Sequence, residues 1–262
     1  MIRDTSLERG NEDLPIALPL GHLSKADQFK DIVDSGQLEP RFCNIFQKKL
    51  IYFSYGGIFH RHSELPTEDP ERFPIAFLFA PSLHKQIDDF YPFDTGAAVS
   101  GKFGSVISPN THQNILEKYS FPGNRTNKVP CELVWCFYGS NRAYLGGSLL
   151  KTTISLPSHY QRSFEVLAHN LSNLGVDHRQ RMIECQAKEN IPLADKLIWV
   201  GYHQSQEPQV IDLKKLLRKE PRDLQFTTSR YTWNDRFIPN EVVSHLMKKA
   251  EEVIDMYMNL EE

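Results

Sequence analysis

The chain has 262 residues, of which 40% are hydrophobic and 24% are charged, as in ordinary soluble globular proteins. These values exclude a disordered or fibrous protein, and the length suits one elaborated domain or two small ones. The net charge of -3 gives the whole chain no attraction to nucleic acid, so such binding would require a local patch of lysine and arginine.

The N-terminal stretch, MIRDTSLERGNEDLP, has acidic residues and no apolar core segment, which predicts a loose leader over residues 1–15 and no secretory signal. No segment of the sequence reaches the roughly 20 apolar residues that a membrane helix needs. We therefore expect a cytoplasmic protein without membrane contact.

The first predicted unit is a strand followed by a helix. The motif GHLS places His22 after the apolar run LPIALPL, and Ser24 is the expected N-cap of a helix over residues 25–35. Gly36 supplies the expected C-terminal stop. The apolar stripe of this helix consists of Phe29, Ile32 and Val33.

Two strands are predicted next. LIYFSYGG, residues 50–57, is dense in apolar and aromatic residues and ends on two glycines, which is typical of a strand entering a tight turn. After a polar loop with several prolines, IAFLFAP over residues 75–81 predicts a strand that is buried on both faces.

The middle of the chain gives weaker patterns. FDTGAAVSGKFG, residues 93–104, predicts a loop or cluster of turns, with a phosphate-holding turn as an alternative. CELVWCFYG, residues 131–139, is interpreted as a strand, and residues 162–175 as a helix. No role is assigned to Asp94 or Glu132.

A glutamate stands within the next predicted strand. Met182, Glu184 and Gln186 alternate with apolar residues, so a strand would direct these three side chains to one face. With a turn over residues 188–190 and a second strand over 197–200, the pattern predicts a β-hairpin. A carboxylate there faces water, pairs with a cation, or lines a cleft where its charge is used. Arg179 and Arg181 are the candidate cations.

The C-terminal part adds a basic segment and a helix. Lys214 to Asp223 either contacts a nucleic-acid backbone or forms a solvated helix face. Asn240 is the expected cap of a helix over roughly residues 241–260. Its stripe consists of Val243, Leu246, Met247, Ala250, Val253, Ile254 and Tyr257.

The sequence shows no repeats, no low-complexity linker and no clear domain boundary. We therefore expect a single α+β domain over residues 1–262, with a long central insertion over roughly residues 62–178. The four cysteines form no CxxC pair and the ten histidines have no zinc-site spacing, so we expect reduced thiols and no metal.

Three features together resemble the ADP-ribosyltransferase superfamily: a histidine in GHLS, a tyrosine in LIYFS and a late strand glutamate. GHLS is similar to the His-x-Ser motif of the poly-ADP-ribose polymerase branch. The resemblance implies a split β-sheet core with flanking helices. It also implies that His22 and Tyr52 hold NAD while Glu184 is catalytic.

A closer resemblance is to the DarT-like group of DNA-targeting ADP-ribosyltransferase toxins. FKDIVDSGQL and RMIECQAKENIPLADKLIWVGY are similar to its helix and to its glutamate strand, and the similarity covers roughly residues 18–60 and 178–204. That group has an arginine just after its tyrosine strand, where this chain has Tyr55, Gly56 and Gly57. Arg61 is the nearest substitute.

The resemblance implies NAD as co-substrate. Cleavage of the bond between nicotinamide and ribose builds positive charge on the sugar, which a nearby carboxylate stabilises. Glu184 is the expected source of this charge, and Gln186 on the same face of its strand is expected to orient the acceptor or to assist the glutamate. The expected NAD-binding residues are His22, Ser24, Tyr52, Tyr55 and Arg61.

The resulting hypothesis is an NAD-dependent mono-ADP-ribosyltransferase that modifies single-stranded DNA or RNA. Such proteins act as toxins or anti-phage effectors, which implies an antitoxin or inhibitor. The expected nucleic-acid contacts are Lys214 to Arg222 with Arg61, Arg179 and Arg181. The alternatives are an NAD glycohydrolase with the same site and an inactive binding protein that retains the fold.

Overall fold

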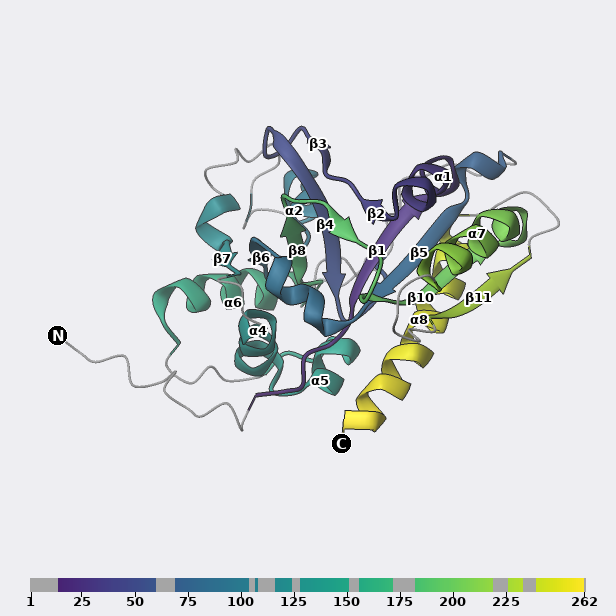
Figure 1. Cartoon of the computed structure of the whole chain (residues 1–262). Coiled ribbons are helices and arrows are strands. Elements are labelled where there is room, and N and C mark those ends of the chain that lie inside the picture. The colour runs from purple at the N-terminus through teal and green to yellow at the C-terminus, as the bar shows by residue number, and fades with distance from the viewer. Residues whose placement is uncertain are drawn as a thin grey trace.

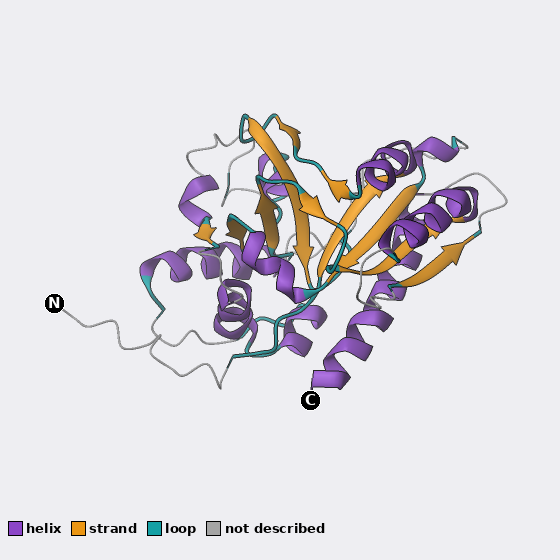
Figure 2. Cartoon of the chain, viewed as in Figure 1, coloured by secondary structure: helices purple, strands orange, loops and turns teal. Residues whose placement is uncertain are grey.

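A computed structural model describes residues 14–59, 69–103, 107, 116–123, 128–150, 156–171, 182–218, 226–232 and 239–261. It is a mixed α/β structure with one large sheet and helices on both sides of it (Figures 1 and 2). The strands are β1 (Leu20–Lys25), β2 (Gln37–Leu38), β3 (Arg41–Cys43), β4 (Lys48–Tyr55), β5 (Pro74–Phe79), β6 (Asp89–Tyr91), β7 (Phe121–Pro122), β8 (Glu184–Ala187), β9 (Ile191–Pro192), β10 (Leu197–His203) and β11 (Thr227–Tyr231). The helices are α1 (Ala26–Ser35), α2 (Thr95–Val99), α4 (Lys128–Tyr138), α5 (Asn141–Gly146), α6 (Ser158–Leu171), α7 (Glu207–Leu217) and α8 (Pro239–Glu261).

The main sheet has the strand order β11-β10-β5-β1-β4-β8-β6-β7, and β3 pairs with β4 beside this path. Only β10 and β11 are parallel among these pairs. The segment 62–178, expected as an insertion, contributes β5, β6 and β7 to this sheet. The predicted α+β class is confirmed.

The sheet divides between β1 and β4. Strand β1 pairs with β5 at six positions but with β4 only at Leu20↔Tyr55 and Gly21↔Ser54. The two strands then diverge, and Figure 1 shows them meeting at one end and separating toward the other. The predicted split sheet is thus present.

A glycine is required where the halves meet. A Cβ on Gly21 would lie 1.9 Å from the carbonyl oxygen of Gly57, so no other residue fits without moving the backbone. The turn after β4 approaches β1 this closely only because position 21 has no side chain.

Helices α1 and α8 cover one half of the sheet, where α8 contacts β5 and β10 and α1 contacts β1, β5 and α7. Gly36 ends α1 in the left-handed conformation, with φ of 68°, as predicted. The predicted stripe of α8 is confirmed, since Val243, Leu246, Ala250 and Ile254 are buried.

Three local predictions are wrong: two concern where a helix begins, and one concerns whether a segment is a strand or a helix. Ser24 belongs to β1 and does not cap α1, which begins at Ala26. Helix α8 begins at Pro239, so Asn240 lies inside its first turn. Of the segment predicted as a strand over residues 131–139, residues 131–138 belong to α4. Helix α4 is buried on most of its circumference, and a short apolar run that is buried all round does not distinguish a helix from a strand.

The predicted hairpin is also wrong. Strand β8 pairs with β4 and β6, whereas β10 pairs with β5 and β11 in the other half of the sheet. The chain between them contributes β9, which pairs with β2. Glu184 therefore lies in the inner part of the sheet and not at a hairpin edge.

Candidate functional site

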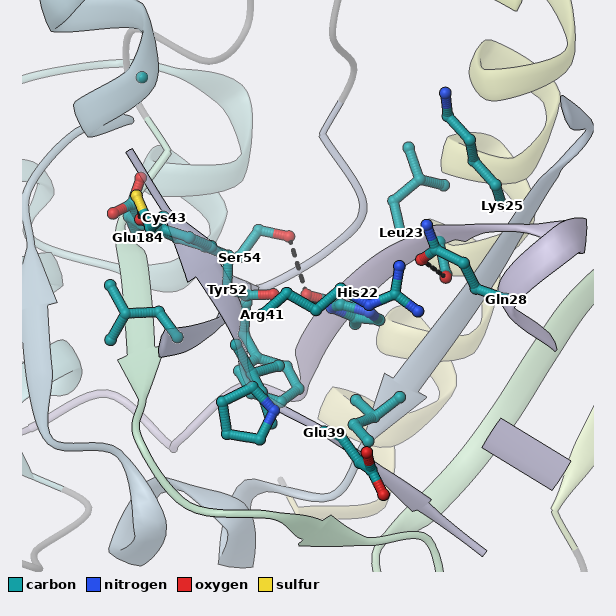
Figure 3. Close-up of a pocket in the computed structure, with 18 of the residues that line it drawn as sticks. His22, Leu23, Lys25, Gln28, Glu39, Arg41, Cys43, Tyr52, Ser54 and Glu184 are labelled. Carbon is teal, nitrogen blue, oxygen red and sulfur yellow. Dashed lines mark hydrogen bonds between the residues drawn. The ribbon is translucent and has the colours of Figure 1, made fainter. Parts of the chain in front are cut away.

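A cavity of about 1160 Å³ opens where β1 and β4 diverge. Its walls come from β1, α1, β3, β4 and the start of α2, together with Met182 and Glu184 at β8. The residues that line it include His22, Ser24, Tyr52 and Glu184. Figure 3 labels His22, Tyr52 and Glu184 among the lining side chains. Residues separated by 162 positions in the sequence thus reach one space.

His22 lies in the gap that the divergence creates. Its Nδ1 is 2.8 Å from the backbone oxygen of Tyr52, and its ring packs against Phe53 and Phe77. A carbonyl oxygen only accepts hydrogen bonds, so Nδ1 must carry a proton. In the neutral ring, Nε2 is then a hydrogen-bond acceptor.

Tyr52 is half-buried on β4 and lies directly opposite Gln186 of β8. Its hydroxyl donates to Sγ of Cys43 on β3, at 2.7 Å. This bond fixes the ring across the cavity wall, since both ends of the side chain are then held. Cys43 itself lines the cavity and is a free thiol.

Glu184 is one of two buried acidic residues of the site, with 3% of its surface exposed, and Asp94 is the other. The Thr95 amide donates to Oε2 at 2.9 Å, and the Thr95 hydroxyl lies 2.8 Å from Oε1 and 3.1 Å from Oε2. Nε2 of Gln186 donates to Oε1 at 2.7 Å. These donors occupy most of the acceptor positions of the carboxylate.

Burial raises the pKa of Glu184 from 4.5 to about 7, and repulsion from Asp94 adds to the rise. The hydrogen bonds from Gln186 and Thr95 lower the pKa and so oppose this effect. The group therefore changes charge near neutral pH. A carboxyl with such a pKa is typical of functional sites, although structural networks also produce it.

Gln186 is fully buried behind Glu184 and does not line the cavity. It shares the predicted face with Glu184 and holds it through the bond above. Within the described residues its Oε1 has no hydrogen-bond partner. The predicted assistance to the glutamate thus has a structural basis, while a direct contact with an acceptor does not.

The other expected NAD-binding residues differ in position. Ser24 is buried at the cavity wall and donates to the side chain of Gln28 at 2.9 Å. Tyr55 is fully buried outside the cavity, where its hydroxyl accepts from the Leu18 amide and lies 3.7 Å from Sγ of Cys131. Successive residues of a strand face opposite sides, so Tyr55 cannot share the cavity face of Tyr52 and Ser54. The expected ligand contact of Tyr55 is therefore withdrawn.

Arg61, Arg179 and Arg181 lie outside the described residues, as do residues 219–225 of the basic segment. Of that segment, Lys214 has its Nζ 3.4 Å from the Thr228 hydroxyl, and Lys215 pairs with Asp212 at 2.9 Å. Helix α7, which bears both lysines, contributes no residue to the cavity wall.

The sequence interpretation missed the role of the FDTGA segment. Asp94 caps α2 by accepting from the Ala97 amide at 2.7 Å, and this turn presents Thr95 to Glu184. The spacing of an aspartate three residues before Ala97 is an N-cap pattern that the sequence does contain. The contact itself spans 89 positions, and no local pattern identifies it.

Within the described ranges, no group of three or more metal-ligating side chains has a geometry suited to a metal ion. Among the described helices, none is long and apolar enough to cross a lipid bilayer.

Comparison with known proteins gives structural likeness alone. No family model and no curated protein matches the sequence. The chain is similar to DarT from Thermus sp. 2.9 in complex with NAD+, with 10% identity, 82% of this chain and 97% of that chain covered, and a TM-score of 0.39. It is also similar to the same protein with carba-NAD+ (10%, 83%, 97%, TM-score 0.40) and with ADP-ribosylated ssDNA (10%, 83%, 96%, TM-score 0.42). At such identity and scores, the likeness assigns no substrate and no residue role to this chain.

Proposed function

We propose that the chain is a cytoplasmic NAD-dependent mono-ADP-ribosyltransferase that modifies single-stranded nucleic acid. One observation supports this proposal above the others. The buried Glu184 carboxyl is held by hydrogen bonds from Thr95 and Gln186 and lines the same cavity as His22 and Tyr52.

The chemistry requires a carboxylate in this setting. When the bond between nicotinamide and ribose breaks, nicotinamide leaves with the bonding electrons and positive charge develops on the sugar. Thr95 and Gln186 hold the carboxylate of Glu184 in place by hydrogen bonds, and Glu184 lines the cavity. A carboxylate fixed in advance stabilises the developing charge without reorganisation.

The cavity suits an extended dinucleotide. Its volume of about 1160 Å³ exceeds the range of roughly 300–1,000 Å³ that is usual for small-molecule sites. Tyr52 offers an aromatic face for nicotinamide, and the proton on Nδ1 leaves Nε2 of His22 to accept from a ribose hydroxyl. Lys25 and Lys102 line the same cavity and have the charge that a diphosphate requires.

The choice of nucleic acid as acceptor follows from the resemblance of the sequence to DarT-like toxins. The same resemblance favours a role as a toxin or anti-phage effector that is kept in check by an antitoxin or inhibitor. The acceptor atom of the nucleic acid would attack the sugar carbon and lose its proton as the new bond forms.

Labelled NAD incubated with separate pools of single-stranded DNA, RNA and protein tests the proposal. We expect label on a nucleic-acid pool, and none with the Glu184→Gln variant. Nicotinamide released at full rate without any acceptor would instead identify an NAD glycohydrolase. A wild-type protein that neither binds nor consumes NAD would leave only an inactive binding protein with this fold.

A further inference from the structure

The hairpin formed by β3 and β4 has an unusual surface beside the cavity. Phe42 on β3 is 60% exposed, more than any other large apolar side chain in the described part of the chain. Three cations, Arg41, Lys48 and Lys49, lie on the same two strands. We call these four residues the hairpin patch.

The cations of the hairpin patch are not neutralised by the protein. Within the described ranges, Arg41, Lys48 and Lys49 form no ion pair. Lys48 lies over the ring of Phe46, at 5.2 Å from its centroid. The carboxylate of Glu39, just before β3, accepts a hydrogen bond from Gln37 at 3.2 Å. The patch therefore presents positive charge in a chain whose net charge is -3.

Strand register connects the patch to the site. Phe42 lies opposite Lys49, so an exposed aromatic ring and a cation stand side by side on one face. Arg41 lies opposite Leu50 and Lys48 lies opposite Cys43, so Arg41 and Lys48 share the cavity face of Tyr52, whereas Phe42 and Lys49 point to the other face of the hairpin. Both Arg41 and Phe42 line the cavity, and Figure 3 shows Arg41 among the lining side chains.

We infer that the hairpin patch binds the single-stranded nucleic-acid acceptor across β3, with Phe42 stacking on an unpaired base, Lys49 contacting a phosphate beside it, and Arg41 and Lys48 contacting the phosphates that follow on the cavity face. This inference rests on the proposed function and names the surface that its acceptor uses. An exposed ring beside cations is the combination by which proteins hold single strands. Bases in a duplex are already stacked on each other and cannot stack on such a ring. Binding of single strands is therefore favoured over binding of duplex.

The acceptor surface then lies on the hairpin of β3 and β4 and not on α7. Lys215 is paired with Asp212, Lys214 is half-buried, and no residue of α7 reaches the cavity wall. A strand bound on α7 would have no described contact with the space where Glu184 lies. A strand on the hairpin patch would border that space directly.

Fluorescence anisotropy with a labelled, mixed-sequence 20-nucleotide single strand, without NAD, tests the inference. We expect Phe42→Ala to weaken binding by about 5- to 150-fold, since stacking on an aromatic ring contributes about 1–3 kcal/mol per base. We expect Lys48→Gln/Lys49→Gln to reduce the slope of log affinity against log salt by about 1.4, which corresponds to two phosphate contacts. The matched control, Lys214→Gln/Lys215→Gln/Arg218→Gln, removes three charges and should leave affinity within about twofold.

Equal binding by wild type and the hairpin variants, or loss of binding only in the α7 variant, would overturn the inference. Wild-type binding of duplex as tightly as single strand would also contradict it, as would no binding of either. NAD cleavage is measured separately on the wild-type protein. If the wild type cleaves NAD but hairpin variants bind the strand normally, the surface is wrong while the proposed chemistry stands. If the wild type does not cleave NAD, the proposed function fails on its own.

Discussion

Glu184 combines two properties that usually exclude each other, since it is almost fully buried and yet holds several hydrogen bonds suited to an ionised group. Burial favours the neutral acid, whereas the donors favour the anion. The balance places its pKa at about 7. The fraction of Glu184 that is ionised near neutral pH therefore depends on individual neighbouring residues. The ionised form is the one proposed to act on the ribose.

The first prediction concerns the charge itself. Glu184→Gln keeps the size of the side chain but removes the negative charge, so we expect NAD cleavage to fall by about 10²-fold or more while NAD binding is retained. Single-turnover release of nicotinamide and calorimetric titration with NAD measure the two effects. A variant as active as the wild type would refute the catalytic role of Glu184.

The second prediction concerns Thr95, which we regard as a positioning residue because it acts through Glu184. The rate of NAD cleavage should rise with pH through about 7, as Glu184 ionises. Thr95→Val removes a donor to the ionised form and should raise the midpoint by about one to two pH units, since a hydrogen bond to a charged group contributes about 1.5–3 kcal/mol. Thr95→Ser retains the hydroxyl and should keep the wild-type midpoint.

Asp94, Tyr91 and Cys185 are the other titratable groups whose charges interact with Glu184. Carbon-13 NMR of the Glu184 carboxyl, assigned with the Glu184→Gln variant, gives the same midpoint without relying on activity. An unchanged titration in Thr95→Val would mean that Thr95 supports the fold alone.

At the scale of elements, the split between β1 and β4 depends on a contact that admits no side chain. Gly21→Ala would place a Cβ 1.9 Å from the Gly57 oxygen, so the strands must separate. We expect the free energy of unfolding to fall by about 1–3 kcal/mol, or more. Urea denaturation of this variant and of Gly146→Ala makes the comparison.

Gly146 is the matched control, because the nearest atom to its added Cβ is Ser148 Oγ at 4.0 Å. That substitution lies at the end of α5, where alanine has the higher helix propensity, and should not destabilise the protein. Equal losses in both variants would show that the approach at Gly21 is not tight.

The sequence identifies elements better than it identifies their partners. The strand of Tyr52, the buried strand β5 and the helix after His22 follow from local apolar patterns, and all are confirmed. The pairing of β8 with β4 and β6 does not follow, because alternation assigns a strand's faces but not its neighbours. The sequence therefore predicts the strand of Glu184 correctly but pairs it with the wrong neighbour.

For the candidate site too, the sequence identifies some residues and misses others. His22, Tyr52 and Glu184 were singled out by residue type and order, and they do line one cavity. Thr95 was not, because its contact with Glu184 arises only when a short helix is folded against β8. Tyr55 was assigned to the site on its proximity in sequence, although strand geometry directs it into the core.

For the whole molecule, the pKa of Glu184 couples folding to pH. Its pKa is about 7 in the folded protein and near 4.5 when exposed, so the folded state binds the extra proton between these values. Stability should therefore decrease as pH rises from about 4.5 to about 7, by on the order of a few kcal/mol. Chemical denaturation at pH 5 and pH 8 should show this decrease in the wild type and not in Glu184→Gln. A parallel decrease in both proteins would assign the effect to other groups.

The connection from β8 to β10 has a mechanical consequence. This stretch runs from one half of the divided sheet to the other, and midway β9 is joined to β2 through Leu38↔Ile191 and Gln37↔Pro192. The Leu193 amide also donates to the Gly36 oxygen at the end of α1, at 2.9 Å. The two halves are thus tied together on the open side as well as at Gly21. Links at both ends of the gap oppose a hinge motion of the two halves of the sheet. We therefore expect the width of the cavity between β1 and β4 to be set before a ligand binds.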